Sequence, residues 1–252
     1  MNQFGPIQVG GGDTATPLNV QKRLALIRRF LPPHPARFID CGCGAGAYVQ
    51  HLIEEFGLDA FGIEFAPDKV SLAHRNPNLQ TRIREGDLQK MPYNDASFDI
   101  ALLNEVLEHV PDEHAAIREI HRILKPGARL IVFSPNRFFP FETHGVTLRG
   151  FDWNAPCYLP FIPYIPLWAG RLVFRYWARN YWPSELRKLF VQNGFEIVAC
   201  DYLWQTFENI SHNQPWFIRR GKGGFRRIAN FLEKIPIIRT AGASQAIILK
   251  KI

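Results

Sequence analysis

The feature that most constrains the fold is a glycine-rich turn placed directly after a short apolar strand. Residues 38–46 read Phe-Ile-Asp-Cys-Gly-Cys-Gly-Ala-Gly, and the segment after them has the apolar spacing of a helix. Glycines at a strand-to-helix turn allow a tight bend and let a ligand approach the backbone closely. Gly42, Gly44 and Ala47 also satisfy the looser dinucleotide fingerprint, and a purely structural turn is the alternative. The run therefore predicts a strand–turn–helix unit with a nucleotide-like ligand at the turn.

Strands and helices alternate regularly around this turn. We expect strands at 37–41, 60–65, 81–84, 98–103 and 129–134 and, after a break, at 195–200 and 245–250. We expect helices at 18–30, 45–56, 67–74, 112–124 and 183–192. This rhythm predicts an α/β fold, doubly wound, with a mostly parallel sheet and helices on both faces.

Acidic residues stand where three of these strands end. Asp40 precedes the glycines, where a carboxylate would repel a pyrophosphate but suits a cationic or zwitterionic ligand. Glu64 ends the second strand, where an acid can accept hydrogen bonds from both ribose hydroxyls. Asp87, in Gly86-Asp87-Leu88, follows the third strand and can meet the amino group of an adenine ring. A nucleoside that carries a charged amino-acid tail fits all three positions.

With these residues in view, the chain resembles the class I S-adenosylmethionine-dependent methyltransferases, of the group that contains the ubiquinone-biosynthesis enzymes. The matching stretches occur in the family's order and spacing within residues 36–135, and they are 39–46, 62–64, 86–88, 91–99, 104–110 and 124–127.

The resemblance implies a seven-stranded sheet whose last strand is antiparallel, with S-adenosylmethionine as cofactor and S-adenosylhomocysteine as product. It implies that Glu64 binds the ribose, that Asp87 with the Leu88 backbone binds the adenine, and that Asn104 lies near the sulfonium. Phe65 would flank the adenine or pack into the core. The residues implied to hold the methionine portion are Asp40, Gly42, Cys43, Gly44 and Gly46.

The 252 residues carry a net charge of +7, 46% hydrophobic residues and only four cysteines. This composition excludes a disordered chain and a disulfide scaffold. We find neither a secretory signal nor a spanning segment in the sequence, so a cytoplasmic protein is expected. We expect a single domain over 1–252, with a flexible arm at 1–16, an aromatic insertion at 136–182 and a basic insertion at 205–242.

Three residues are candidates for the base that removes a proton from the acceptor: His109, His144 and Glu142. His144 follows the fifth strand, and the Thr143-His144 pair resembles a Thr-His pair in quinone-type relatives. The pKa of an unperturbed histidine suits a general base. A surface histidine with one backbone hydrogen bond is the alternative for His144. A structural role bracing the loop after the fourth strand is favoured for His109.

Glu105, Glu108 and His109 form a Glu-x-x-Glu-His pattern that could hold a divalent cation. The same letters serve as scaffold in many relatives, so we expect no bound metal. Cys41 and Cys43 are a still weaker ligand pair, because no further Cys or His is paired near them.

Eleven aromatic residues lie between 151 and 182, with prolines at 156, 160, 163 and 166. Trp and Tyr favour sites that are apolar at one end and wet at the other, which indicates a lid or a surface that rests on lipid. A small extra core over the sheet edge is the alternative. We therefore expect a small, apolar acceptor such as a quinone precursor or a lipid, methylated at oxygen.

The segment 215–240 carries seven basic residues and one acidic residue, Glu233. Phe225, Ile228 and Phe231 alternate there with Arg226 and Arg227, which predicts a basic amphipathic helix on an anionic membrane. The solvated face of an ordinary helix is the alternative.

Three other functions are alternatives to methylation of a small molecule. The basic segment fits an RNA methyltransferase, but Asn104-Glu105-Val106-Leu107 lacks the Pro-Pro-aromatic motif typical of exocyclic-amine methylation, so nucleic acid is disfavoured. Asp40 before the glycines argues against a nicotinamide-dependent oxidoreductase. A cofactor-binding scaffold without turnover is the non-enzymatic alternative.

Overall fold

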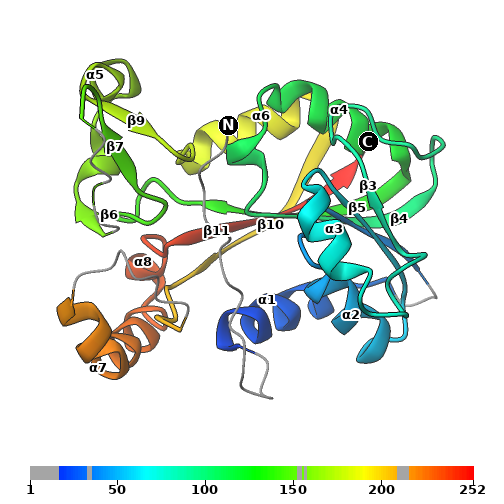
Figure 1. The fold of residues 1–252 in the computed structure, drawn as a ribbon, viewed down its shortest axis with the longest axis horizontal. Coiled ribbons are helices and arrows are strands. Elements are labelled where there is room, and N and C mark those ends of the chain that lie inside the picture. The colour runs from blue at the N-terminus through cyan, green and yellow to red at the C-terminus, as the bar shows by residue number, and fades with distance from the viewer. Residues whose placement is uncertain (1–16, 33–35, 152–154, 156–157, 209–215) are drawn as a thin grey trace. The chain divides into compact units, whose positions relative to one another are not determined.

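The structure is a computed structural model that describes residues 17–32, 36–151, 155, 158–208 and 216–252 (Figure 1). The predicted arm at 1–16, Trp153, Pro156 and part of the basic insertion (209–215) lie outside the described residues. The chain divides into two compact units. We call residues 26–136, 179–201 and 244–252 the sheet unit, and residues 1–25, 137–178 and 202–243 the insertion unit. The organisation as a single domain stays a prediction.

A seven-stranded sheet forms the centre of the sheet unit, in the order β10-β11-β5-β4-β1-β2-β3. Strands β1, β2, β3, β4 and β5 run parallel to their neighbours, and β11 runs antiparallel to β5, which confirms the expected fold class. The strands are β1 Arg37–Cys41, β2 Asp59–Glu64, β3 Ile83–Glu85, β4 Phe98–Asn104, β5 Leu124–Pro135, β10 Phe195–Leu203 and β11 Ser244–Lys251.

Helices cover both faces of this sheet. Apolar residues of α4 and α6 join one core cluster with Ile39, Cys41 and Leu103 of the strands. The residues that alternate with them, Phe38 and Leu102, are also fully buried, so the opposite face is covered as well. In Figure 1, α4 and α6 lie above the strands and α2 lies below them. The helices of the sheet unit are α2 Ala47–Glu54, α3 Pro67–Ala73, the 3-10 helix η1 Leu107–His109, α4 Glu113–Ile123 and α6 Pro183–Gln192, while α1 Leu18–Arg29 is divided between the two units.

Local sequence signals explain where these helices begin and end. Asp112 caps α4, because its carboxylate accepts a hydrogen bond from the Ala115 backbone N–H at 2.9 Å. Pro183 occupies the first turn of α6, and Gly194, with a φ of +86°, follows its end. These signals predicted α6 to the residue.

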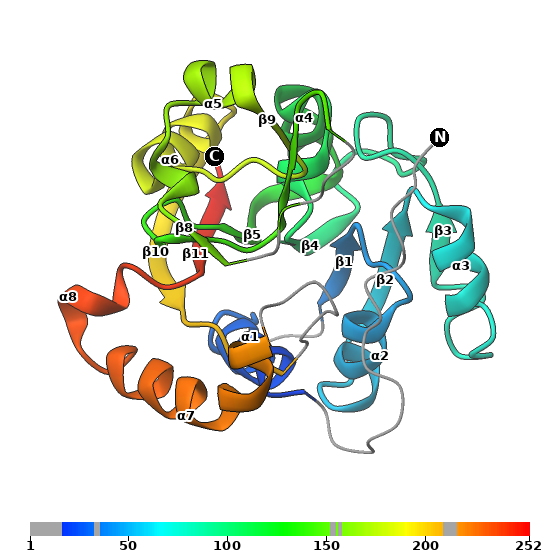
Figure 2. The same ribbon diagram turned by 60° about the vertical axis from the view of Figure 1, so that its left-hand side comes forward.

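The insertion unit is built from short elements around a small core. Phe139, Tyr158 and Ile218 form its buried cluster. The elements are the antiparallel pairs β6 Phe141–Glu142 with β8 Leu159–Pro160 and β7 Val146–Leu148 with β9 Phe174–Tyr176, then η2 Ile162–Tyr164, α5 Leu167–Val173, α7 Trp216–Leu232 and α8 Pro236–Arg239. Figure 2 shows α7 and α8 following one another. Among the described residues, we find no helix with the length and apolarity to cross a bilayer.

Candidate functional site

The order of the strands places a ligand crevice at the carboxyl ends of β1 and β4. The two strands are parallel neighbours, and the chain leaves β1 for β2 on the other side, so the strand order reverses between them. Open α/β sheets bind ligands at such a switch point. Asp40 and Cys41 end β1, and Asn104 ends β4. The structure thus brings these predicted residues to one edge of the sheet.

The glycine loop needs its glycines for two different reasons. Gly42, Gly44 and Gly46 all have positive φ, at +84°, +55° and +84°. A Cβ at Gly42 would lie 2.5 Å from Val106 Cγ2, and one at Gly46 would lie 2.4 Å from Ile83 Cδ1, so both sites are closed by packing. A Cβ at Gly44 would meet no atom of the described residues within 4 Å. Gly44 is therefore the glycine whose open side can admit a ligand.

Asp40 is a buried carboxylate with an unsatisfied oxygen. Its residue is 1% exposed, and Oδ1 has no hydrogen-bond partner among the described residues. Burial, and secondarily the charge of Glu64, raises the pKa of Asp40 to about 8. A buried carboxylate without a donor is costly, and a cationic ligand group would satisfy it.

Asn104 presents a second buried oxygen at the end of the neighbouring strand. Its Oδ1 is buried without a hydrogen-bond partner among the described residues. The next residue, Glu105, has a positive φ of +55°, and its N–H donates to the Phe133 carbonyl at 2.9 Å. The chain therefore turns sharply at Glu105, directly after Asn104.

Glu64 is fixed by the backbone of the loops beside it. Its Oε2 accepts a hydrogen bond from the Gly44 N–H at 2.8 Å, and its Oε1 accepts one from the Ala66 N–H at 2.9 Å. Each oxygen keeps a second lone pair, so the carboxylate can still accept hydrogen bonds from two hydroxyl groups. Phe65 is 73% exposed, which excludes the alternative that it packs into the core.

Asp87 is held by the turn that follows it. Its Oδ1 accepts a hydrogen bond from the Gln89 backbone N–H at 2.8 Å, and the Gln89 side-chain amide donates to both carboxylate oxygens. Leu88, between them, is buried. An Asp followed two residues later by its own donor is a common turn signal, and through it Gln89 could have been found in the sequence.

The two cysteines of the loop are buried and free. Burial, together with the charge of Asp40, raises the pKa of both thiols well above the ordinary value. Because the thiolate is the form that binds metals, this environment disfavours Cys41 and Cys43 as a ligand pair. A Cβ at Gly62 would lie 2.5 Å from Cys43 Sγ, so the cysteine packs against β2.

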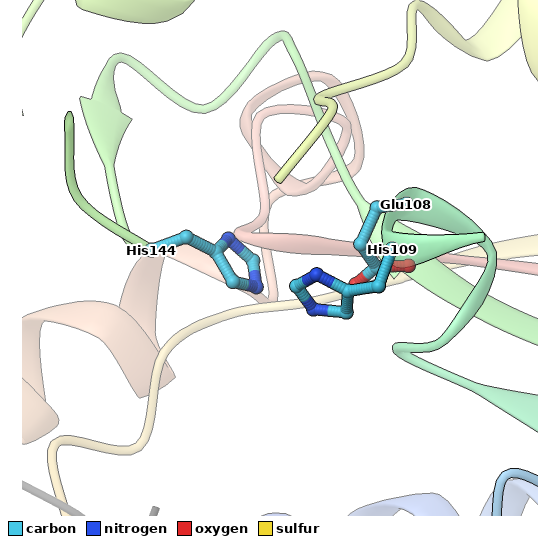
Figure 3. A group of neighbouring side chains, drawn as sticks. All are labelled: Glu108, His109 and His144. Atoms are coloured by element: carbon cyan, nitrogen blue, oxygen red, sulfur yellow. The ribbon is translucent and has the colours of Figure 1, made fainter. Parts of the chain in front are cut away.

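Two of the candidate bases, His109 and His144, come from different elements, as Figure 3 shows. His109 ends η1 of the sheet unit and is exposed. His144, in the insertion unit, is half-buried, and its Nδ1 lies 3.3 Å from Thr143 Oγ1. Glu142 is 1% exposed, and its carboxylate accepts a hydrogen bond from the His144 backbone N–H at 2.9 Å. Glu142 therefore fixes the backbone that carries His144.

The Glu-x-x-Glu-His pattern does not form one ligand set. Glu105 Oε1 accepts a hydrogen bond from Ser244 Oγ at 2.6 Å. Glu108, on η1, is buried. Among the described residues, Glu105, Glu108 and His109 are not grouped within reach of one ion. The contact between Glu105 and Ser244 joins residues 139 positions apart, and the sequence carries no local signal for it.

Comparisons with known proteins agree with this geometry. Residues 39–132 match a family model described as a methyltransferase domain. The chain is 29% identical to norajmaline N-methyltransferase of Rauvolfia serpentina over 133 residues, 50% of this chain and 46% of that protein. It is 27% identical to demethylmenaquinone methyltransferase of Oceanobacillus iheyensis over 64% of this chain and 69% of that protein. The matched part spans less than half of the first relatives' own length.

A solved methyltransferase structure shares the fold. A SAM-dependent methyltransferase from Methanosarcina mazei aligns with a TM-score of 0.59 at 18% identity, covering 90% of this chain and 97% of that one. The matched family model covers the glycine loop, the acidic strand ends and the turn after β4, where the candidate cofactor residues lie. The cofactor of this family is S-adenosylmethionine. The sheet unit has the fold of the class I S-adenosylmethionine-dependent methyltransferases, and residues 39–132 match a methyltransferase domain.

Proposed function

We propose that the chain binds S-adenosylmethionine at the carboxyl ends of β1, β2 and β4 and transfers its methyl group to a small, apolar acceptor. The observation that carries the proposal is a pair of buried oxygens at the ends of adjacent strands, Asp40 Oδ1 and Asn104 Oδ1, for which the described part of the chain offers no donor. Buried polar atoms in native proteins are nearly always hydrogen-bonded. An ammonium group from a ligand would supply the missing donors.

The residues of the sheet unit fit the other parts of the cofactor. The open side of Gly44 gives the methionine portion access to the backbone. Glu64, held in place by two backbone N–H groups, would accept hydrogen bonds from the ribose hydroxyls. Asp87 and the Leu88 backbone would bind the adenine, with exposed Phe65 stacked on the ring. Gly42, Cys43 and Gly46 shape the loop that the methionine portion contacts.

When bound, S-adenosylmethionine supplies a methyl group that its sulfonium makes electrophilic. The chain must then orient the acceptor and remove a proton from it. We assign the removal of this proton to His144. The Thr143 hydroxyl lies beside its Nδ1, and the Glu142 carboxylate accepts a hydrogen bond from its backbone N–H, so two neighbours fix this residue. Nε2 is the nitrogen that we assign to proton transfer. His109 is the second candidate, and its exposure suits the role less well.

Two observations support an apolar acceptor. The insertion unit leaves large aromatic side chains exposed, among them Phe151, Phe161 and Trp168 at 67%, 64% and 75%. One relative aligns with this chain over 69% of its own length, and it is named for demethylmenaquinone, which is a quinone. We propose a hydroxyl oxygen of a quinone-like or lipid molecule as the methylated atom, since a neutral hydroxyl needs the base that His144 provides. Contact with an anionic membrane would give access to such an acceptor.

Calorimetric titration with S-adenosylmethionine and S-adenosylhomocysteine tests the cofactor half of the proposal, with NAD as the control ligand. We expect micromolar binding of both sulfur nucleosides, none of NAD, and a loss of affinity in Glu64→Ala. Glu54→Ala removes an exposed carboxylate on α2 and is the matched control that should bind normally. A folded wild-type protein that binds neither nucleoside would overturn the proposal.

Turnover tests the acceptor half. Methyl transfer from labelled cofactor is measured with quinol-like compounds, with lipid phenols and with a structured RNA as the competing substrate class. Transfer to the apolar compounds supports the proposal, and transfer to RNA alone contradicts it. Cofactor binding without transfer to any acceptor would favour a scaffold instead.

A further inference from the structure

Helices α7 and α8 of the insertion unit carry apolar side chains that the fold leaves uncovered. In α7 only Ile218 and Ala229 are buried, and no residue of α8 is buried. An ordinary surface helix of a globular protein turns its apolar stripe to the core. Here several large apolar side chains are exposed instead, and they are Trp216 (64%), Phe217 (50%), Ile228 (57%), Phe231 (64%) and Ile237 (85%).

One side of α7 is firmly attached to the insertion unit. Ile218 belongs to the buried cluster of this unit, and Phe225 packs against that cluster. Arg226 Nε donates to the Thr206 carbonyl at 2.9 Å. Near the end of the helix, Lys22 Nζ lies 3.1 Å from Asn230 Oδ1 and 2.5 Å from Glu233 Oε2. These contacts fix which side of the helix faces outward.

The outward side combines an apolar stripe with a basic border. With 3.6 residues per turn, Phe217, Ile228 and Phe231 fall within a sector of about 60°, opposite the attached side. Arg220 and Arg227 lie next to this sector by the same geometry. The Arg220 guanidinium stands 5.9 Å from the centre of the Trp216 ring, so a cation and an aromatic ring meet at the start of the stripe.

The basic residues of this surface have their charge available. Glu233, the acidic residue of the segment, pairs with Lys22, and Arg226 lies 4.0 Å from Glu208. Within the described residues, Arg219, Lys222, Arg227 and Lys234 make no ion pair. The surface therefore presents uncompensated positive charge beside exposed aromatic and aliphatic side chains.

We infer that the outward face of α7 and α8 docks on a bilayer that contains anionic lipids. Phe217, Ile228, Phe231 and Ile237 enter the boundary between headgroups and acyl chains, while Arg220 and Arg227 contact lipid phosphates. A helix with basic residues on one flank and Trp, Phe and Ile on the other binds in this way. RNA would match the positive charge but would leave the apolar stripe exposed to water. The charge therefore favours an anionic lipid surface over a neutral one.

This inference extends the proposed function, because it brings the enzyme to an acceptor dissolved in lipid, but its measurement needs no methyl transfer. The purified chain is floated with vesicles of phosphatidylcholine and with vesicles that also contain phosphatidylglycerol. We expect binding to the anionic vesicles that weakens in high salt, and at least about tenfold weaker binding to neutral vesicles.

Two double variants test the surface itself. Ile228→Ser with Phe231→Ser removes the centre of the apolar stripe, and Arg220→Gln with Arg227→Gln removes its basic border. Each should lower the affinity for anionic vesicles about tenfold or more, because both components hold the helix at the interface. All the replaced apolar side chains are exposed, so the fold is kept, and a thermal melt checks this.

Trp168→Ser with Leu172→Ser is the matched control. It removes two equally exposed apolar side chains from α5 of the same unit, each 75% exposed, and vesicle binding should not change. The inference is overturned if the wild type ignores anionic vesicles, if the α7 variants bind as well as the wild type, or if Ile228→Ser with Phe231→Ser abolishes a dimer seen by light scattering. Calorimetry with S-adenosylmethionine on the same samples separates the outcomes, because lost cofactor binding contradicts only the proposed function.

Discussion

The sheet unit and the insertion unit differ in the kind of side chain that they offer to a ligand. In the sheet unit, the carboxylates sit at strand ends and are fixed by neighbouring backbone, as Glu64 is by Gly44 and Ala66. In the insertion unit, the strands are two or three residues long, and large aromatic residues stay exposed. Carboxylates fixed in this way suit a polar ligand that is the same in every catalytic cycle. The exposed aromatic residues suit apolar partners, for which shape and area matter more than hydrogen bonds.

In the proposed function, the cofactor binds to the sheet unit and residues of the insertion unit contact the acceptor. Variants in the sheet unit should therefore change cofactor affinity, and variants in the insertion unit should change turnover.

The largest expected effect is on turnover, in His144→Gln. Loss of a general base lowers kcat about 100- to 10,000-fold, while the dissociation constant of S-adenosylmethionine stays the same. Turnover with the best acceptor and calorimetry on the same protein measure both quantities. His109→Gln is the control and should lower kcat less than about tenfold. Weaker cofactor binding in His144→Gln would contradict the proposal that variants in the insertion unit change turnover and not cofactor affinity.

The second prediction concerns Asp40→Asn. The buried carboxylate supplies the charge that a cationic ligand group would meet, so its loss should weaken S-adenosylmethionine binding by about 100-fold. The free protein should remain folded, because asparagine is close in size to aspartate and places no charge at this buried position. Calorimetry and thermal melts test the two statements separately. Normal affinity in the variant would show that Asp40 does not face the cofactor.

The pH dependence of stability follows from the same carboxyl group. Its pKa is raised from 3.8 to about 8 in the folded chain, so the folded state binds the proton more tightly than the unfolded state. The contribution of Asp40 to the free energy of unfolding is therefore largest below about pH 4 and decreases as the pH rises towards 8. Denaturant titrations across this range should show the decrease in the wild type and a smaller one in Asp40→Asn. Saturating S-adenosylmethionine should make the free energy of unfolding depend less steeply on pH. An equal pH dependence in the wild type and in Asp40→Asn would contradict the assignment of this dependence to Asp40.

Two glycine variants separate packing from ligand access. Gly46→Ala places a methyl group at a positive φ and against Ile83, so it should lower the free energy of unfolding by about 2–4 kcal/mol. Gly44→Ala has the strained φ but open space, so it should cost about 1 kcal/mol. Denaturant unfolding measures both. Gly44→Ala should still lose affinity for S-adenosylmethionine, and unchanged affinity would mean that the open side is not used.

The smallest effect is expected in Phe65→Ala. The ring is 73% exposed, so its removal should leave the free energy of unfolding unchanged within about 0.5 kcal/mol. Loss of stacking on the adenine should weaken cofactor binding about tenfold. Phe161→Ala, which removes a ring that is 64% exposed from the insertion unit, is the control and should leave cofactor affinity unchanged. If both variants weaken cofactor binding equally, the stacking role is wrong.

Much of the sheet unit was predictable because its signals are local. The bounds of β1 and α6 were predicted to the residue, since an apolar run, Pro183 and Gly194 mark them directly. α2 begins at Ala47 and not at the expected position 45, because Gly46 still has the left-handed conformation. β5 begins at Leu124, earlier than the expected start at 129, and Gly127 is accommodated in the strand with positive φ.

The insertion unit was less predictable because its structure depends on distant partners. Strands such as β6 and β8 are two residues long, too short to show a periodicity, and Glu142 pairs with Leu159, 17 positions later in the chain. The amphipathic helix in the basic segment was predicted, as α7 confirms. The exposure of the apolar side chains of α7 could not be predicted. It depends on which side of the helix packs against Phe139 and Thr206.

The position of β11 has a consequence for the synthesis of this protein. β11 lies between β5 and β10 in the sheet, although the ribosome makes it after both. Until residues 244–251 have emerged, β10 has no strand to pair with, and the Glu105 side chain lacks Ser244. The turn at Glu105 can therefore mature only after β11 has been made, and until then the nascent sheet keeps an open edge that invites chaperone binding.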